Sequence, residues 1–399
     1  MSDRTLLLGI DLGNEKTQLA VYDRKTHEPL LIGSTEENPD GLLETVIVRE
    51  GQEPLRNFVD KIQQGEDIVV NGKYSHPVNV LAYYFRKTLS LTRKQYPGET
   101  IRQLVVTVPE AAKEFVQMIY DALDKIGIGK ERAIVLSHKQ SFMYYVLYQK
   151  KEIWVNDVGV FDYSENRLNY YQMQVDKAKE PVLAGVHAKD YSDALALTDM
   201  GGPHKAAIFE NIVYGAIHKQ LLSTLYMTGD GFEGDWAESV FRKLCIGRRL
   251  FKGRNLYVSG ACYAAYEMVE HKRLEHYLLL DEEMITSHVL IRAYTDAEEK
   301  EILLARAGTP WYLVDEEIDV IPDGDTEIPV TVRNVFDQKE KQFMLDLEPV
   351  LTRADKHCRL GLRVRFASTK MCVVTLKDKG FGDMYPTSNR IWEKSFEIS

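Results

Sequence analysis

Short apolar runs separated by glycine and polar turns open the chain. Residues 6–10 form an apolar run that ends at Asp11, Gly13 follows where the chain must turn, and residues 19–21 are apolar again. Runs of this length between turn residues are typical of β-strands. The pattern therefore predicts a strand, a glycine turn and a returning strand over residues 6–23.

Longer segments with helical spacing follow. Apolar residues recur every three or four positions in five segments, which predicts helices at residues 78–96, 110–126, 204–222, 238–247 and 259–269. Short apolar runs between them predict strands at residues 42–50, 68–74, 103–108, 133–136, 158–161, 168–175 and 225–228. Residues 181–199 alternate loosely and predict a strand with a loop. This mixture of strands and helices is typical of an α/β fold.

The pattern changes from about Leu274. Helical spacing gives way to short alternating runs, at residues 288–294, 301–305, 326–333, 342–347, 360–366 and 371–376. Turn signals separate them, among them Pro322-Asp323-Gly324-Asp325. These features predict an antiparallel β-sandwich of six to eight strands.

Composition and charge narrow the class of protein. The chain has 399 residues, 44% of them hydrophobic, which is enough for two or three domains with proper cores. Its net charge of -10 and isoelectric point near 5.6 disfavour nucleic acid and anionic membranes as partners. No apolar run approaches the ~20 residues of a membrane span, and the N-terminus lacks the pattern of a signal peptide. We therefore expect a cytoplasmic protein.

The residues that most often ligate metals are scattered along the chain. The four cysteines, Cys245, Cys262, Cys358 and Cys372, show no CxxC spacing. The same holds for His187, His204 and His218, which are dispersed rather than set at ligand spacing. We expect reduced, mostly buried thiols and no metal site made of these residues.

The tip of the first predicted hairpin is the first candidate for chemistry. A hairpin tip can present backbone N–H groups and one carboxylate, which together can hold phosphates and, through water, a magnesium ion. Here the candidates are Asp11, Gly13, Asn14 and Lys16, although Glu15 would oppose a phosphate. The alternative is an ordinary hairpin at the beginning of a domain.

Five motifs, taken in order and spacing, resemble the actin-like ATPase superfamily, and most closely its DnaK-type heat-shock chaperone branch. They are GIDLG at 9–13, LVVTVPEAA at 104–112, VGVFDYSENRL at 158–168, LYMTGDGF at 225–232 and NLYVSGACYAA at 255–265. They cover roughly the first two thirds of the chain. The resemblance implies two ribonuclease-H-like α/β lobes around a nucleotide cleft, with lobe I at about 1–155 and lobe II at about 156–272.

The resemblance also implies a set of nucleotide-binding residues. Asp11 and Asp162 would hold waters bound to magnesium in a family member. Gly229, Asp230 and Gly231 stand where the family has two glycines beside the adenosine, and they could admit a nucleotide or another flat ligand, or simply be structural. Together with Gly13, Asn14 and Lys16 they form the expected site for ATP or ADP with magnesium, with binding that is weak or lost.

The catalytic positions of the family are altered in this chain. His138 takes the position of the family's catalytic glutamate, and no Asp or Glu occurs between Ile134 and Lys151. Tyr163-Ser164-Glu165-Asn166 follows Asp162 where the family has glycines, and Glu165 would repel a γ-phosphate. We therefore interpret residues 158–175 as a plain hairpin rather than a phosphate clamp, and we expect no catalytic residue.

Two further features leave alternatives open. Phe232 and Trp236 stand near the place of the family's adenine-stacking arginine, so they could stack on a base or fill a vacated pocket. The basic cluster Arg248, Arg249, Lys252 and Arg254 could bind phosphate or an acidic partner, or be a solvated loop.

The C-terminal third carries a fainter likeness. Residues 302–311 and 360–380 resemble the peptide-binding β-domain that follows the chaperone ATPase, which implies a β-sandwich domain at 273–399 that binds a polypeptide. We expect a chaperone-like binding or scaffolding protein with little or no ATPase activity. The alternatives are an active ATP-dependent chaperone, a small-molecule kinase of the same superfamily, or a filament-forming protein.

Overall fold

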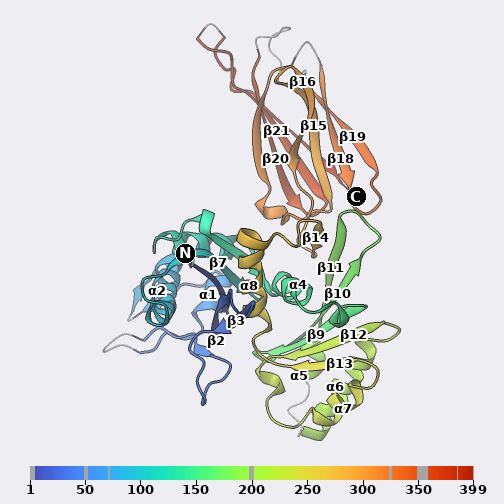
Figure 1. The fold of residues 1–399 in the computed structure, drawn as a ribbon. Coiled ribbons are helices and arrows are strands. Elements are labelled where there is room, and N and C mark those ends of the chain that lie inside the picture. Colours follow the sequence, from blue (N-terminus) through green and yellow to red (C-terminus); the bar gives the residue numbers. More distant parts are fainter. Residues whose placement is uncertain are drawn as a thin grey trace. The chain divides into compact units, whose positions relative to one another are not determined.

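The computed structural model describes residues 5–48, 53–70, 72–196, 202–322, 326–347, 358–383 and 385–398. It is a mixed α/β structure with several sheets (Figure 1). The chain forms two compact units. Unit 1 comprises residues 1–177 and 184–277, and unit 2 comprises residues 178–183 and 278–399.

The first sheet of unit 1 has the strand order β3-β2-β1-β7-β8. β2 runs antiparallel to β1, whereas β7 and β8 run parallel to it. The strands are β1 (Thr5–Leu12), β2 (Lys16–Asp23), β3 (Glu28–Leu31), β7 (Thr100–Val108) and β8 (Ala133–Ser137), and β4 (Leu43–Glu44) pairs with β2. The helices α1 (Phe58–Gln63), α2 (Pro77–Gln95) and α3 (Lys113–Asp124) share one apolar core with this sheet.

Five of the six strands of the second sheet repeat this arrangement, in the order β11-β10-β9-β12-β13. Again the second strand of the motif is antiparallel to the first, and the two strands on the other side are parallel to it. The strands are β9 (Asp157–Ser164), β10 (Arg167–Asp176), β11 (Val182–Asp190), β12 (Leu222–Thr228) and β13 (Arg249–Lys252). The helices α5 (Ser192–Ala196), α6 (Gly202–Ala216) and α7 (Glu238–Leu244) accompany this sheet, and α6 and α7 share a core with it.

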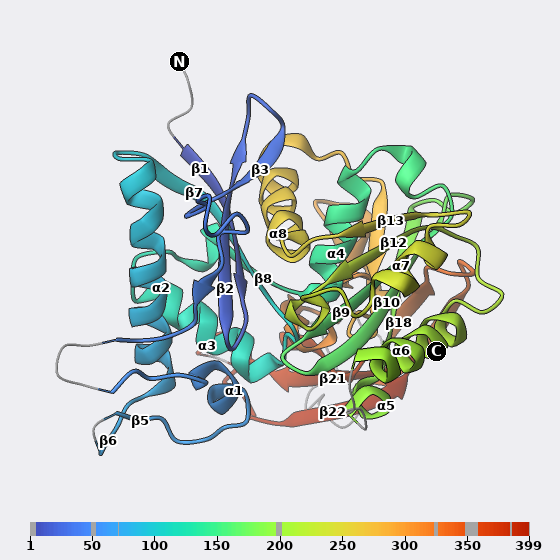
Figure 2. The same ribbon diagram turned by 90° about the horizontal axis from the view of Figure 1, so that it is seen from below.

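Two helices, α4 (His138–Tyr148) and α8 (Leu256–Tyr266), run between the two sheets (Figure 2). α8 is buried from Leu256 to Ala265 and packs against β1, β2 and β7 of the first sheet. α4 reaches the second sheet through Tyr145, whose ring packs edge-on against Tyr226 of β12. We predicted the helix at 259–269 as part of the second lobe, but the small side chains of α8 let it lie directly on the first sheet.

Unit 2 is built of antiparallel strands. One sheet has the order β16-β15-β18-β19 and the other β17-β20-β21-β22, and apolar side chains of both sheets form one core. The strands are β15 (Ser287–Thr295), β16 (Glu298–Ala305), β17 (Asp315–Val320), β18 (Glu327–Asn334), β19 (Glu340–Asp346), β20 (Leu360–Ser368), β21 (Met371–Asp378) and β22 (Ile391–Glu397). β14 (Tyr277–Leu280) precedes them, and its Leu280 packs with Leu183 and Met284.

Several predicted elements differ from those observed. The helix predicted at 204–222 ends at Ala216, and Leu222 already begins β12. Residues 42–48 hold the two-residue β4 and an isolated bridge from Ile47 to Leu55, and residues 49–50 lie outside the described part. Residues 68–74 form two short paired strands, β5 (Val69–Val70) and β6 (Lys73–Tyr74), instead of one. β11 is followed by the short helix α5 rather than by a loop, because Asp190 accepts hydrogen bonds from the backbone and hydroxyl of Ser192 at the helix start. Residues 197–199 lie outside the described residues.

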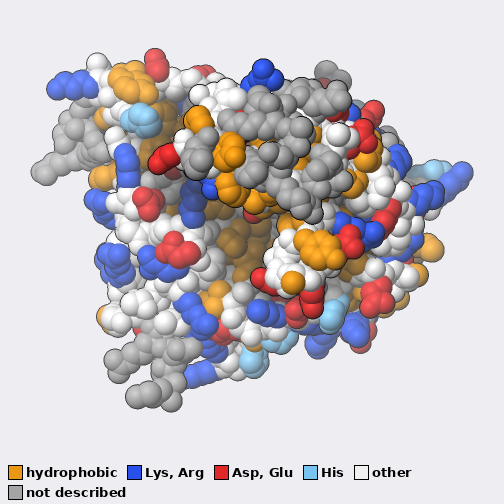
Figure 3. Space-filling model, turned by 90° about the horizontal axis from the view of Figure 1, so that it is seen from above, with side chains coloured by type: hydrophobic (Ala, Val, Ile, Leu, Met, Phe, Trp, Pro, Cys, Tyr) orange, Lys and Arg blue, Asp and Glu red, His pale blue; other side chains and the backbone are white. Residues whose placement is uncertain are grey.

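Acidic and basic side chains are interspersed on the face that Figure 3 shows. Within unit 2, charged side chains pair across neighbouring strands, such as Arg363 with Asp315 and Arg333 with Glu340. Such exposed pairs contribute little stability. Within the described residues, none of the helices combines the length and apolar character that a bilayer crossing requires.

Candidate functional site

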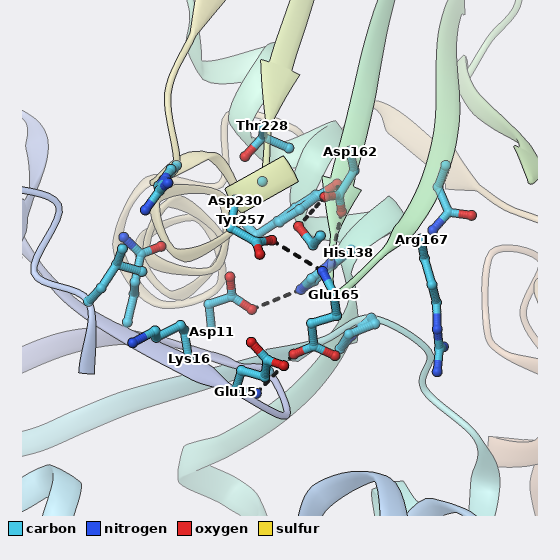
Figure 4. Close-up of a pocket in the computed structure, with 18 of the residues that line it drawn as sticks. Asp11, Glu15, Lys16, His138, Asp162, Glu165, Arg167, Thr228, Asp230 and Tyr257 are labelled. Carbon is cyan, nitrogen blue, oxygen red and sulfur yellow. Dashed lines mark hydrogen bonds and ion pairs between the residues drawn. The ribbon is translucent and has the colours of Figure 1, made fainter. Parts of the chain in front are cut away.

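A cavity of about 330 Å³ lies in unit 1 where the carboxyl ends of β1 and β9 meet (Figure 4). Its wall comes from the β1–β2 turn, the β9–β10 hairpin, the first turns of α4 and α8, and the segment after β12. The lining residues are Asp11, Gly13, Glu15, Lys16, Gln18, Leu42, Pro109, Glu110, His138, Asp162, Ser164, Glu165, Arg167, Asn169, Tyr171, Asp190, Thr228, Gly229, Asp230, Glu233, Arg254 and Tyr257. This volume is at the low end of the range for small-molecule pockets.

The imidazole of His138 stands between the two aspartates that the sequence singles out. Its Nε2 atom lies 2.8 Å from Oδ1 of Asp11, and its Nδ1 atom lies 3.8 Å from Oδ2 of Asp162. Asp11 is the one acidic residue of β1 and lies next to its end, and Asp162 lies in the corresponding place near the end of β9. Figure 4 shows the histidine ring between the two carboxylates. One side chain therefore links residues of both sheets.

Burial and charge act in opposite directions on His138. Burial by itself lowers the pKa of the imidazole, but the carboxylates of Asp11 and Asp162 outweigh this effect and raise the pKa from 6.5 to about 9. The ring is therefore a cation at neutral pH. An imidazolium donates from both nitrogens, which matches the two carboxylates on its two sides.

Tyr257 of α8 completes the environment of this histidine. Its ring stacks on His138 with centroids 3.7 Å apart, and its hydroxyl donates a 2.8 Å hydrogen bond to Asp162. Burial raises the pKa of Tyr257 well above 10, with a further contribution from the charge of Asp162. The phenol therefore stays neutral and serves as a hydrogen-bond donor, while its face contacts the cationic ring.

The local sequence explains why His138 points into the cavity. Ser137 ends β8 and is the N-cap of α4, accepting a hydrogen bond from the Gln140 backbone while the Gln140 side chain accepts one from the Ser137 backbone. This reciprocal capping box fixes the first turn of the helix. His138, as the first helical residue, is thereby held at the carboxyl edge of the first sheet.

Glu165 sits at the tip of the β9–β10 hairpin in a left-handed conformation. Glu165 and Asn166 have φ values of 52° and 61°, as a two-residue type I′ turn requires. Our prediction of a plain hairpin agrees with this geometry, but β9 extends to Ser164, so only two residues form the tip. Both tip residues carry a Cβ atom and still adopt positive φ, because the twist of the hairpin requires it.

The Glu165 carboxylate reaches across to the first hairpin. Its Oε1 atom accepts a 2.9 Å hydrogen bond from the backbone N–H of Glu15, while its own N–H donates to Oδ1 of Asp230. Burial raises the pKa of this carboxyl group, and the hydrogen bond from Glu15 partly offsets that rise. The backbone donor that a phosphate would need at the β1–β2 turn is thus already bonded to a carboxylate of the same chain.

The remaining predicted residues of the first hairpin have structural contacts. Gly13 lies in the lining, and its N–H donates to the carbonyl of Lys16 across the turn. Lys16 also lines the cavity, but it is half exposed and its ammonium group lies 3.9 Å from Glu44. Asn14 is not in the lining. Its side chain accepts a hydrogen bond from the Asp60 backbone and so holds the start of α1.

Gly229, Asp230 and Gly231 follow β12, and only the first two line the cavity. A Cβ atom at Gly231 would lie 2.2 Å from the ring of Tyr163, and one at Gly229 would lie 2.2 Å from the Tyr163 carbonyl oxygen. These glycines therefore admit the β9–β10 hairpin. The close approach that the resemblance assigns to an adenosine is made here by Tyr163.

The two aromatic residues after this segment do not line the cavity. Phe232 is buried and packs with Tyr163, Phe209 and Trp236, while Trp236 donates a hydrogen bond to the Gly231 carbonyl. The sequence left open whether these two rings stack on a base or fill a vacated pocket. In the structure they pack in the core beside the second sheet.

The basic cluster predicted around residue 250 is divided. Arg254 lines the cavity and pairs with Glu233, whereas Arg249 donates to the Glu152 carbonyl and Lys252 lies over the ring of Phe241. Arg248 and Arg249 both line a second pocket outside this cavity. The four cations therefore do not form one group, and of the four only Arg254 lines the cavity.

The cavity wall is strongly acidic. Eight of its side chains are Asp or Glu, against three that are Lys or Arg and the single His138. An acidic wall repels a polyphosphate, because the unfavourable field grows in a partly enclosed, poorly solvated space. Asp11 and Asp162 contact a cationic ring, and Glu165 occupies the N–H of Glu15. These residues do not fit a magnesium-bound nucleotide in the arrangement described.

No group of three or more His, Cys, Asp or Glu side chains among the described residues could hold a metal ion. All four cysteines are free, with Cys262, Cys358 and Cys372 buried and Cys245 exposed.

Sequence reasoning missed the contributions of Tyr257 and Glu165. Tyr257 was quoted only as part of a motif, and Glu165 was considered only for its repulsion of a phosphate. The one signal for Glu165 is its place in the turn after an apolar strand, immediately before Asn166, where hairpins favour Asn, Asp or Gly over a large acidic residue.

These features define an α/β protein whose two similar sheets meet at a cavity bridged by a histidine. A family model described as "Family of unknown function (DUF5716) C-terminal" matches residues 47–282, more than half of the chain, and the chain belongs to that family. A second model, "Domain of unknown function (DUF8552)", matches residues 284–398. The change from one match to the other lies close to Leu278, where the main segment of unit 2 begins. No curated protein matches the chain.

Proposed function

We propose that unit 1 is a degenerate actin-like ATPase fold and that the protein works as a chaperone-like binding or scaffolding protein. In this proposal ATP hydrolysis is absent or very slow, and a polypeptide partner binds unit 2. The observation that carries the proposal is the position of His138, which places a cation where a family member would keep the magnesium between its two aspartates.

The strand order supports the actin-like part of the proposal. When β4 and β14 are left aside, the other five strands of each sheet have the order 3-2-1-4-5, numbered along the chain, and the second strand is antiparallel to the first. Two such sheets with a cavity between the ends of their first strands are what the resemblance implies. A fold, however, does not fix a function, so the site has to carry the second half of the argument.

The cavity supports the loss of hydrolysis. A catalytic carboxylate would have to orient the attacking water, and the corresponding position is His138, which is engaged by Asp11 and Asp162. The acidic wall and the bond between Glu165 and the Glu15 backbone act in the same direction.

Unit 2 supports the binding role through its sheet edges. β17 and β22 are the terminal strands of one sheet, and β16 and β19 of the other. A terminal strand can pair with an extended polypeptide through main-chain hydrogen bonds. Ile391 at the start of β22 is an apolar side chain with 63% of its surface exposed, which gives such a segment an apolar contact.

The nucleotide part is tested by isothermal titration calorimetry of the full chain with ATP and ADP, with and without magnesium, together with a phosphate-release assay. We expect no binding or weak binding and no turnover above the buffer. The double variant Asp11→Asn/Asp162→Asn is the control, because any genuine turnover should disappear in it. Magnesium-dependent turnover by the wild type that the double variant lacks would overturn the proposal.

The binding part is tested with a permanently unfolded, alkylated and fluorescently labelled polypeptide. We expect binding by the full chain that is equal with and without ATP and weaker in Ile391→Lys. Tyr294→Lys is the matched control, since Tyr294 is an exposed apolar side chain of β15 in the other sheet of unit 2, where it is paired with Glu299 of β16. Equal loss in both variants, or no binding by the wild type, would contradict the assignment of β22.

A further inference from the structure

We propose that the cavity of unit 1 is closed by its own side chains. In this proposal the Glu165 carboxylate occupies the anion position of the β1–β2 turn, the His138 ring occupies the cation position between Asp11 and Asp162, and together they clasp the two sheets without a nucleotide. We call Glu165, His138 and their partners the internal clasp. The proposed function enters only where these two positions are compared with those of a phosphate and a magnesium ion. The contacts of the internal clasp do not depend on that function.

The first half of the clasp is an anion held by a backbone donor. Glu165 lies in the turn that joins β9 and β10 of the second sheet, and Glu15 lies in the turn that joins β1 and β2 of the first sheet. Their 2.9 Å hydrogen bond therefore crosses between the sheets. A carboxylate on a backbone N–H makes a charge-assisted hydrogen bond, which is stronger than a neutral one. The same donor in a hairpin turn would serve an oxygen of a bound phosphate.

The second half of the clasp is a cation shared by two carboxylates. His138 follows β8 of the first sheet and lies 2.8 Å from Asp11 of that sheet, and 3.8 Å from Asp162 of the second. Without a cation, two buried carboxylates at this position would repel each other across the cavity. The ring thus does for the two sheets what a divalent ion would do between the same oxygen ligands.

Glu165 makes this contact from a backbone conformation that is unfavourable for a glutamate. The residue is held at a φ of 52°, a left-handed conformation that Asn or Gly enters more easily. Asn or Gly at position 165 would therefore relieve the backbone strain of the hairpin. A glutamate at this place gives up backbone stability and gains a side chain long enough to reach the Glu15 backbone.

The His138 half of the clasp lies beside a close contact between two helices. α4 and α8 touch backbone to backbone, since a Cβ atom at Gly260 would lie 1.9 Å from the carbonyl oxygen of Ser141, one helical turn from His138. Opening of the cavity would have to break the contacts that Glu165 and His138 make between the two sheets. A ligand-driven closure needs an open state to begin with, and the clasp removes it.

The test measures opening with and without the clasp. Spin labels are placed on Cys245, the one exposed native cysteine, and on Lys61→Cys in α1 at the other side of the cavity. The labelled full chain is compared by double electron–electron resonance as wild type, Glu165→Asn and Glu15→Ala. Asn accepts the left-handed conformation, so the first variant keeps the hairpin and loses the carboxylate. The second removes a neighbouring carboxylate but keeps the bond.

For the wild type we expect one narrow distribution of distances between the spin labels, unchanged by ATP with magnesium. Glu15→Ala should give the same distribution. Glu165→Asn should give a distribution that is broader or shifted to longer distances. Hydrogen exchange at the Glu15 amide should be at least tenfold faster in Glu165→Asn than in the wild type. Glu165→Gln, which keeps the length and an acceptor oxygen, should lie between the two.

A wild-type distribution that narrows only with ATP, or fast exchange at the wild-type Glu15 amide, would overturn the internal clasp without any variant. Identical distributions in the wild type and Glu165→Asn would do the same. Phosphate release by the wild type would contradict the proposed function instead, and it is measured separately.

Discussion

The Nε2 atom of His138 lies 2.8 Å from a carboxylate oxygen of Asp11, in a part of unit 1 where both side chains are largely removed from solvent. The hydrogen bond joins the first turn of α4 to the end of β1, two segments 127 residues apart. Because the second nitrogen of the ring faces Asp162, loss of the ring would leave two carboxylates without their shared cation. The first prediction concerns this loss.

His138→Gln should lower the free energy of unfolding of unit 1 by about 3 kcal/mol or more, the usual cost of removing one partner from a buried charge pair. Urea unfolding followed by the fluorescence of Trp154 and Trp236, both in unit 1, measures the change. In the background of Asp11→Asn the same substitution should cost much less, because one of the two carboxylates is then neutral. Equal costs in both backgrounds would show that the histidine acts through packing alone.

The raised pKa of His138 predicts a stability that falls toward alkaline pH. The folded protein holds this proton more tightly than the unfolded chain, so the contribution is complete below about pH 6.5 and is lost as the pH rises through 9. A shift of this size corresponds to at most about 3 kcal/mol. We expect the urea midpoint of unit 1 to decline between pH 6.5 and 9.5 in the wild type.

The control for the pH series is His138→Gln. Its midpoint should change much less over the same range, since the variant lacks the imidazole that gives up its proton, and burial raises the pKa of the stacked Tyr257 well above 10, so that this phenol stays neutral. A parallel decline in both proteins would assign the pH dependence to other groups.

Much of the fold follows from local patterns in the sequence. The helical spacing over residues 78–96 corresponds to α2 at Pro77–Gln95, and the apolar run at 103–108 to the buried part of β7. β17 and β22 were not predicted, because Asp315, Glu316 and Glu317 make the first segment look like a charged loop and the second alternates around charged residues. Their strand pairing depends on neighbours distant in the chain.

The site could be predicted only in part. Asp11 and Asp162 were found because each ends an apolar strand, and equivalent strand ends of the two sheets meet at the cavity. The position of His138 between them depends on three segments at once, and the capping of α4 that aims the ring is a local detail. Asn14 and Gly231 were also predicted for the site, but neither lines the cavity. Asn14 accepts a hydrogen bond from the backbone of α1, and Gly231 packs against the ring of Tyr163.

The contact between α4 and α8 gives a prediction about backbone packing. Gly260→Ala should destabilise unit 1 by about 3 kcal/mol or more, because the added Cβ would lie 1.9 Å from the Ser141 carbonyl oxygen and backbone cannot turn aside as a flexible side chain does. Gly215→Ala in α6 is the matched control, since a Cβ there would meet nothing within 4 Å. The control should be neutral or stabilising by up to about 1 kcal/mol through helix propensity. Similar effects of both substitutions would contradict the close contact.

The buried thiols give the last prediction, because they report on the two units separately. Cys262 of α8 lies in a core of unit 1 beside Leu7 and Val105, whereas Cys372 of β21 lies in the core of unit 2. Burial raises the pKa of Cys262 above its usual range and that of Cys372 to about 12, so neither reacts with a thiol reagent until its core opens.

Only Cys245 should react quickly in the native protein. In low concentrations of urea, Gly260→Ala should speed the modification of Cys262 and leave that of Cys372 unchanged, as mass spectrometry of the labelled peptides would show. Equal acceleration at both cysteines would mean that the two cores open together, and it would contradict our expectation that unit 1 and unit 2 unfold independently.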